Sequence, residues 1–131
     1  MSGRLVEISQ TRQRPGEPRR RWFYSHEQDL YVWYGADGNI SAFQLCYDKE
    51  RSERVLYWRA DRGYAHLRVD SVRRHATPVL VADGRFDRDR VLTRFSVLAE
   101  ELPEDVAEWV CRRLRAYAPP RTEPPWWKEW F

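Results

Sequence analysis

The sequence predicts an α+β domain, in which an antiparallel sheet of about five or six strands, mostly a meander of hairpins, packs two C-terminal helices on one face. Segments with strand-like patterns all precede residue 83, and apolar side chains recur at helical spacing only after residue 87. With 131 residues the chain is long enough for one domain and too short for two ordinary ones. Its seven Trp, seven Tyr and five Phe can supply a core.

The first strand candidates are segments 21–25, 29–34 and 40–47. An Asp-Gly pair between the last two is typical of a hairpin turn. With a turn centred near Asp37, one face would hold Leu30, Val32, Ile40 and Ala42, and the other Tyr31, Trp33, Phe43 and Leu45. A hairpin that is apolar on both faces belongs in the middle of a sheet that something covers.

Segments 54–60 and 64–70 predict a second hairpin. We assign one of its faces to the core, namely Val55, Tyr57, Ala65, Leu67 and Val69. The other face is assigned to solvent or a ligand, and carries Arg54, Trp58, His66, Arg68 and Asp70. A three-residue turn centred on Arg62 would pair Trp58 with His66 and Arg54 with Asp70. The apolar segment 78–82 is a further strand, whose neighbour in the sheet the sequence leaves open.

Two helices complete the predicted domain. Asp87 is placed to cap the first helix, and Pro103 ends it and suits the first position of the second. Acidic residues open the second helix and arginines close it, as the helix dipole favours. The residues expected to pack on the sheet are Phe95, Leu98, Val106, Val110 and Leu114.

The polar face of the second hairpin is the first candidate site. Trp58, His66, Arg68 and Arg54 could together stack on and hydrogen-bond an anionic or planar ligand. The alternative is a solvated sheet face held by ordinary cross-strand pairs.

The two ends of the chain differ from the predicted domain at 20–118. Residues 1–19 predict a flexible basic arm, in which Leu5, Val6 and Ile8 could form a short strand. Residues 119–131 form a Pro/Trp-rich tail, whose partner-binding candidates are Trp126, Trp127, Trp130 and Phe131. These residues could bind a protein partner or a second copy of the chain. The tail could instead fold back over the sheet or helix pair of its own chain, or stay disordered.

Charge argues against nucleic acid as the main partner. The net charge is +3, and residues 1–21 hold six arginines against two glutamates, so the basic excess belongs to the arm and not to the fold. Weak phosphate binding through that arm remains a third function hypothesis. The sequence contains no apolar run of membrane-spanning length and no signal peptide, so we expect a cytoplasmic protein without membrane association.

The sequence carries no strong catalytic signature. Cys46 and Cys111 lie in apolar segments, and we expect them to be small buried hydrophobic residues. The three histidines are far apart in the sequence and have no metal-ligand spacing. We therefore expect no metal and no cofactor. The enzyme or small-ligand alternative would need a pocket between sheet and helices, with candidates Cys46, His66, Arg68 and Asp48.

Several local patterns resemble one known family. They are Arg20-Arg21-Trp22-Phe23, Asp29-Leu30, Val32-Trp33, Phe43-Gln44-Leu45-Cys46-Tyr47-Asp48-Lys49, Trp58 and Ala76-Thr77-Pro78. Over residues 20–100 the chain resembles a family of small bacterial proteins of about this length with no assigned function. The resemblance implies a bacterial cytosolic origin and brings no activity, cofactor or catalytic residue. The leading hypothesis is a small non-enzymatic binding or interaction module that uses the polar hairpin face, the aromatic tail or both. It rests on exposed-type aromatic residues without a catalytic constellation.

Overall fold

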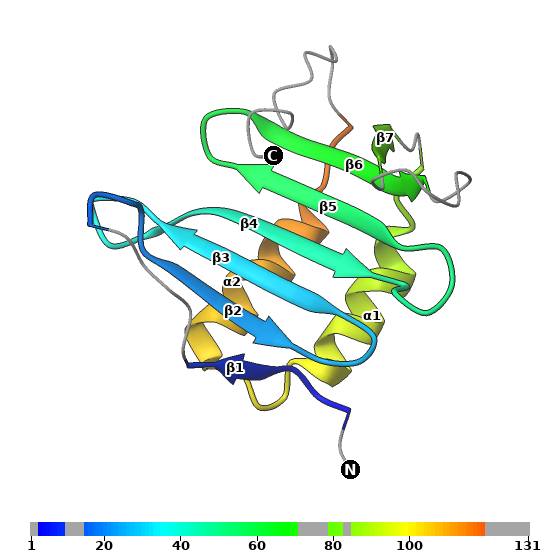
Figure 1. Cartoon of the computed structure of the whole chain (residues 1–131), viewed down its shortest axis with the longest axis horizontal. Coiled ribbons are helices and arrows are strands. Elements are labelled where there is room, and N and C mark those ends of the chain that lie inside the picture. Colours follow the sequence, from blue (N-terminus) through cyan, green and yellow to red (C-terminus); the bar gives the residue numbers. More distant parts are fainter. Residues whose placement is uncertain (1–2, 10–14, 71–78, 83–84, 120–131) are drawn as a thin grey trace.

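The computed structural model describes residues 3–9, 15–70, 79–82 and 85–119. These residues form a seven-stranded sheet followed by two helices (Figure 1). The strands are β1 (Val6–Ile8), β2 (Arg20–Tyr24), β3 (Asp29–Tyr34), β4 (Ile40–Tyr47), β5 (Arg54–Arg59), β6 (Gly63–Asp70) and β7 (Val79–Ala82). The helices are α1 (Arg88–Leu98) and α2 (Glu104–Arg115).

The sheet is an antiparallel meander in which strand order follows sequence order. The predicted α+β class is confirmed, and the sheet has at least one strand more than we expected. The apolar segment 79–82 pairs with its sequence neighbour β6, which settles the position that the sequence left open.

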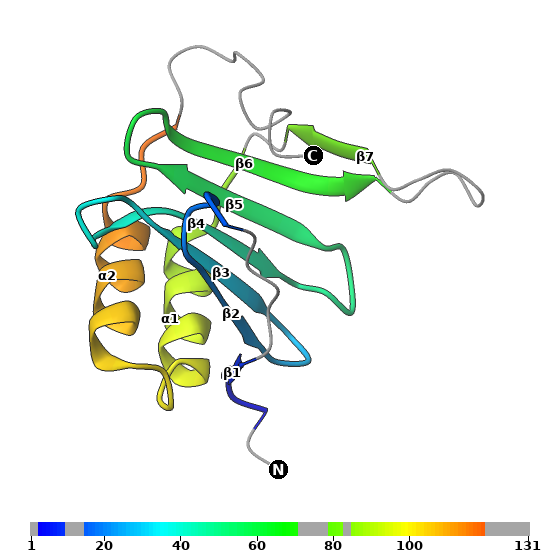
Figure 2. The same cartoon turned by 60° about the vertical axis from the view of Figure 1, so that its left-hand side comes forward.

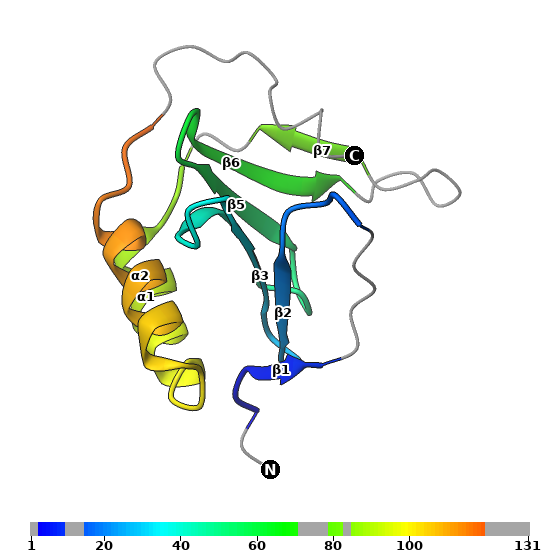
Figure 3. The same ribbon diagram turned by 90° about the vertical axis from the view of Figure 1, so that its left-hand side faces the viewer.

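Both helices cover the same face of the sheet (Figure 3). The core between the two layers is built by apolar side chains from alternate strand positions and from one stripe of each helix. The predicted packing residues Phe95, Leu98, Val106, Val110 and Leu114 are all buried in it.

Local sequence explains where each helix begins. The Asp87 carboxylate accepts a hydrogen bond from the backbone N–H of Arg90 at 3.4 Å, so the predicted cap of α1 is confirmed. Pro103 occupies the cap position of α2 rather than its first turn. Acidic residues in the first turn of α2 and arginines in its last turn agree with the helix dipole, as predicted.

The register of the first hairpin differs from the prediction. A β-bulge between Trp33 and Tyr34 shifts the pairing, so Val32 lies opposite Phe43 and Leu30 opposite Leu45. A one-residue shift moves every side chain of a strand to the other face. Phe43 and Leu45 therefore join Leu30 and Val32 under the helices, while Tyr31 and Trp33 lie on the other face.

The second hairpin turns one residue earlier than predicted. The backbone N–H of Arg62 donates to the carbonyl of Arg59 at 3.1 Å, and Gly63 follows with φ of 86°. This is a three-residue turn that ends on a left-handed residue, a conformation that glycine adopts without strain. The predicted pairing of Trp58 with His66 is therefore wrong, because Trp58 lies opposite Tyr64 and His66 opposite Leu56. Arg54 lies opposite Arg68 and not opposite Asp70.

Part of the predicted N-terminal arm belongs to the folded domain. Strand β1 pairs with β2, and the side chain of Leu5 is fully buried in the core. The Leu5 N–H donates to the Leu98 carbonyl at 2.8 Å, and Arg4 forms an ion pair with Glu100 at 2.6 Å. These contacts connect the start of the chain to the end of α1.

The sheet also carries a second buried cluster on the face away from the helices. We call it the apolar patch, and it consists of Cys46, Val55, Tyr57, Ala65 and Leu67 from β4, β5 and β6. Sheet alternation directs these side chains opposite to their neighbours in the main core. Of the residues that the sequence assigned to the core side of the second hairpin, Val55, Tyr57, Ala65 and Leu67 are thus buried, but on the helix-free face, and Val69 is half-buried.

Candidate functional site

The structure places the predicted hairpin site under the helices. Trp58 is 6% exposed and stacks on Phe43, with 6.0 Å between ring centroids and 27° between planes. The Trp109 ring meets it edge-on at 5.9 Å, and the Arg113 guanidinium lies 4.8 Å from its centroid. The solvent-facing assignment of Trp58 is therefore wrong, since its ring is enclosed by the core.

His66 is also buried and takes part in an aromatic cluster. Its Nε2 is hydrogen-bonded to the Tyr47 hydroxyl, and the two rings stack with centroids 5.9 Å apart. Phe86, just before α1, closes the cluster with its ring centroid 5.2 Å from the His66 ring. The hydrogen bond satisfies polar groups that would otherwise be costly to bury, so it explains a histidine in this position.

The two arginines of the predicted site have different surroundings. Arg54 is half-buried and donates to the Asp48 carboxylate at 3.4 Å and to the Ser52 carbonyl at 3.2 Å. Arg68 is exposed and lies opposite Arg54 in the register. The four candidate residues do share one face, but Trp58 and His66 are enclosed, which leaves Arg68 as the exposed member.

The residues of the enzyme alternative are not brought together. Cys46 belongs to the apolar patch on the helix-free face, whereas His66 lies on the helix side. Burial raises the pKa of the Cys46 thiol to about 12, so it is protonated and a poor nucleophile at neutral pH. Its sulfur accepts a hydrogen bond from the Gln44 side-chain amide at 3.3 Å.

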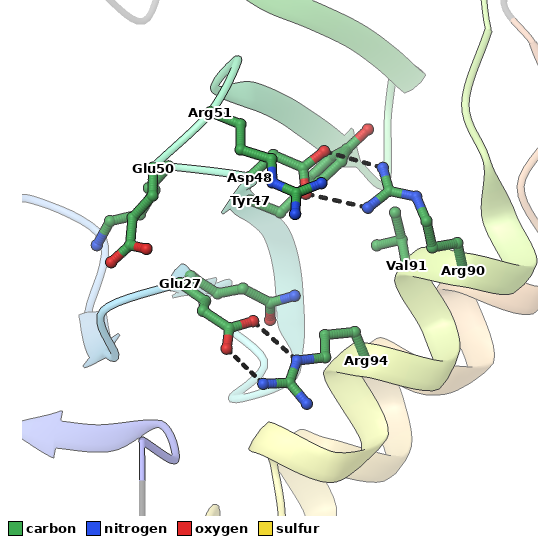
Figure 4. Close-up of a pocket in the computed structure, with 10 residues that line it drawn as sticks. Glu27, Tyr47, Asp48, Glu50, Arg51, Arg90, Val91 and Arg94 are labelled. Carbon is green, nitrogen blue, oxygen red and sulfur yellow. Dashed lines mark hydrogen bonds and ion pairs between the residues drawn. The ribbon is translucent and has the colours of Figure 1, made fainter.

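A polar cleft of about 390 Å³ lies between α1 and the loops at one end of the sheet. Its lining residues are Glu27, Gln28, Tyr47, Asp48, Lys49, Glu50, Arg51, Arg90, Val91 and Arg94. Figure 4 shows two guanidinium–carboxylate pairs across it, Arg90 with Asp48 and Arg94 with Glu27. Neither His66 nor Cys46 lines this cleft. Because opposite charges already neutralise each other here, these pairs join the helix to the loops rather than attract an anion.

Asp48 connects three of the elements around the cleft. Arg90 donates to both of its carboxylate oxygens, at 3.0 and 2.9 Å, and Arg54 adds a longer contact. The hydrogen bonds from Arg90 lower the pKa of the Asp48 carboxyl, against a smaller opposing effect of burial. Asp48 has φ of 53°, a left-handed conformation that Asp and Asn tolerate better than most residues.

We expect the substitution Asp48→Asn to lower the free energy of unfolding by about 1–2 kcal/mol at pH 7, because charge-assisted bonds to two arginines are lost while the backbone conformation is kept. Since the folded-state pKa is lowered, ionised Asp48 stabilises the fold above about pH 4, and this contribution is lost as the pH falls through the folded-state pKa. Urea unfolding of both chains between pH 3 and 7 should therefore show a difference that shrinks in acid.

The matched control is Asp61→Asn. Asp61 pairs with Arg59 at 3.0 Å in the β5–β6 turn, but its side chain is 62% exposed. That change should alter the free energy of unfolding by less than about 0.5 kcal/mol. Equal losses for both variants would mean that Asp48 does not join the loop to α1.

The helix-free face carries a continuous row of aromatic rings on β2 and β3. We call it the aromatic row, and its members are Trp22, Tyr24, Tyr31 and Trp33. Trp22 and Tyr31 are nearly parallel, with centroids 5.7 Å apart, and Trp33 follows Tyr31 at 6.2 Å. Tyr24 meets Trp22 edge-on at 6.2 Å. All four rings are half-buried, so each keeps some surface open to solvent.

Charged groups gather at one end of the aromatic row. The Lys49 ammonium lies 4.5 Å from the Tyr24 ring centroid and forms an ion pair with Asp29 at 2.9 Å. Asp29 also accepts a hydrogen bond from the Trp22 indole at 3.2 Å. Burial raises the pKa of the nearby Glu53 carboxyl, and the charge of Asp29 adds to this effect. The row therefore ends in two carboxylates and one cation that is already paired.

Sequence reasoning missed the aromatic row as a site. Its signal was present, since aromatic residues alternate on two adjacent strands at 22 and 24 and at 31 and 33. The predicted register instead put Tyr31 and Trp33 beside core residues of β4. A β-bulge between Trp33 and Tyr34 places Tyr31 and Trp33 on the opposite face from Phe43 and Leu45. The residue pattern does not reveal this bulge.

The partner-binding candidates Trp126, Trp127, Trp130 and Phe131 lie outside the described residues. Within the described part of the chain, no three His, Cys, Asp or Glu side chains gather as a metal site. Neither described helix is long and apolar enough to cross a bilayer. No protein-family model, no curated protein and no solved structure matches the chain.

Proposed function

We propose that this chain is a non-enzymatic binding module that holds an extended, proline-rich peptide on the aromatic row. The observation that carries the proposal is the run of four partly open rings on the sheet face without helices. Proline-rich segments recognise aromatic-lined surfaces because their extended conformation is preformed and costs little entropy on binding.

Charge favours such a peptide over a single-stranded nucleic acid. Stacking of bases on aromatic rings would also suit the row, but it works together with a positively charged groove for the phosphates. Here Lys49 is paired with Asp29, and Glu53 lies beside them. An anionic backbone would meet these carboxylates, whereas a proline-rich peptide brings no charge of its own.

The buried thiol of Cys46 and the enclosed ring of His66 support a binding role over catalysis. The row is a surface on a rigid sheet, and binding there needs no titrating group. The Trp-rich tail, the other candidate partner-binding element, stays a prediction because it lies outside the described residues.

The test is a titration of decaproline into the full chain, followed by calorimetry and by amide NMR shifts. We expect shifts centred on β2 and β3, and a Trp22→Ala substitution should weaken binding about tenfold or more, since aromatic residues dominate such contacts. Trp109→Phe on α2 is the matched control, because it changes a half-buried tryptophan in the helix layer. It should leave the affinity unchanged.

Other outcomes would overturn the proposal. Binding of single-stranded oligothymidine in preference to decaproline, with a steep salt dependence, would indicate a nucleic-acid surface. No shift of the row residues with either probe would remove the binding role of this face.

A further inference from the structure

The helix-free face of the sheet carries carboxylates at one end and arginines at the other. The β2–β3 and β4–β5 loops lie at the same end of the sheet (Figure 2), where Asp29 begins β3 and Glu53 immediately precedes β5. Arg20 begins β2 and Arg59 ends β5, so both lie at the opposite end. Strand alternation puts all four side chains on the face of the aromatic row. A ligand that lies along the row therefore meets opposite charges at its two ends.

Glu53 lies close enough to the aromatic row to act on it. The Val69 N–H donates to the Glu53 carbonyl at 2.9 Å, which extends the β5–β6 pairing by one residue. Alternation then directs the Glu53 side chain to the same face as the apolar patch and the aromatic row. Burial raises the pKa of the Tyr31 hydroxyl, and the charges of Asp29 and Glu53 add to this effect. The Glu53 carboxylate is thus part of the electrostatic environment of the row.

This carboxylate has no partner of its own in the described part of the chain. The Lys49 ammonium forms its ion pair with Asp29, at 2.9 Å, and donates to the Ser25 carbonyl at 2.9 Å. Among the described residues, no hydrogen bond or ion pair is made by the Glu53 carboxylate, which is half-buried. Burial and the charge of Asp29 raise its pKa, and Lys49 offsets only part of this rise. A cation brought by a ligand would stabilise the ionised carboxylate.

We propose that the peptide bound on the aromatic row carries an arginine or lysine beside its proline-rich segment, and that this cation pairs with Glu53. The inference rests on the proposed function, because it assigns the chemistry of the same ligand. The rings favour such a residue too, since aromatic faces attract cations, as the Lys49 ammonium 4.5 Å from the Tyr24 centroid illustrates. An acidic residue at this end would meet Asp29 and Glu53, so repulsion adds to the selectivity.

The test compares blocked peptides in which decaproline is extended by one arginine or one glutamate. Each charged residue is placed at the first position in one peptide and at the last position in another, because the row does not fix the direction of the bound chain. Calorimetry with the full chain should show, for one of the two placements, that the arginine peptide binds about fivefold more tightly than the glutamate peptide. The difference should shrink as salt is added.

Substitutions in the chain locate the charge responsible. Glu53→Gln should reduce the preference for arginine to less than about twofold, because it removes the charge and keeps the shape of the side chain. Glu50→Gln is the matched control, since it removes the same charge from the same loop. Glu50 is exposed and lines the cleft beside α1 instead of the row, so this variant should keep the full preference (Figure 4).

The outcomes separate this inference from the function on which it rests. Binding that Trp22→Ala weakens, but that shows no preference for arginine in either placement, would overturn the inference and leave the proposed function standing. A preference that survives Glu53→Gln, or that Glu50→Gln removes equally, would also overturn it. If none of the peptides binds, the proposed function fails, and the pairing with Glu53 fails with it.

Discussion

Replacing Trp58 with alanine should lower the free energy of unfolding by about 3–5 kcal/mol, the usual cost of removing a large aromatic side chain from a core. Trp58 stacks on Phe43, meets Trp109 edge-on and lies under the Arg113 guanidinium. Its removal leaves a cavity between β5 and α2, where Trp109 and Arg113 pack against the ring. Urea unfolding followed by circular dichroism measures the loss.

Trp33→Ala is the matched control for this substitution. Trp33 is half-buried on the helix-free face, where its ring stacks on that of Tyr31. Its loss should cost less than half as much as the loss of Trp58, because less apolar surface is removed from water. A Trp58→Ala chain of unchanged stability would return Trp58 to the ligand-binding role that the sequence suggested.

The helices and turns of this fold were predictable where residues close together in sequence determine the local structure. Asp87 caps α1, and glycine occupies the left-handed position in both hairpin turns, at Gly38 and Gly63. The helices follow from apolar spacing, and their packing on one sheet face follows from the order of strands before helices. Each of these features depends on residues close together in sequence.

Register and face were not predictable by the same means. Both faces of β4 and β5 are apolar, so alternation alone cannot say which face the helices cover. The polar residues that suggested a solvated face are His66 and the arginines beside it. His66 lies in the core because Tyr47, nineteen residues earlier, supplies its hydrogen bond. Such a partner becomes visible only when the strands are paired in space.

The same limit explains the candidate site. Trp22 and Tyr31 come together because β2 and β3 pair in register, which the sequence permits but does not select. The helices α1 and α2 cover only one face of the sheet. Trp58 is buried because it lies on that face, and the aromatic row stays partly open because it lies on the other. Once that side is known, both assignments follow from alternation.

The start of the chain provides a second large expected effect. Leu5→Ala should lower the free energy of unfolding by about 2–5 kcal/mol, although position 5 lies in a segment whose composition suggests a flexible arm. Leu5 is fully buried, and its N–H donates to the Leu98 carbonyl at the end of α1. Its side chain therefore fills the space where β1 meets the helix layer, and urea unfolding measures the loss.

Val6→Ala provides the matched control on the same strand. Val6 is 45% exposed, so its truncation removes little buried surface and should cost less than about 0.5 kcal/mol. Hydrogen exchange supplies an independent check, because the Leu5 amide should be protected in the native chain as part of a backbone hydrogen bond. Equal and negligible losses at both positions, with a rapidly exchanging Leu5 amide, would show that residues 3–9 detach from the sheet. A large loss confined to Leu5 would place the start of the domain at β1, because a detachable arm cannot contribute core stability.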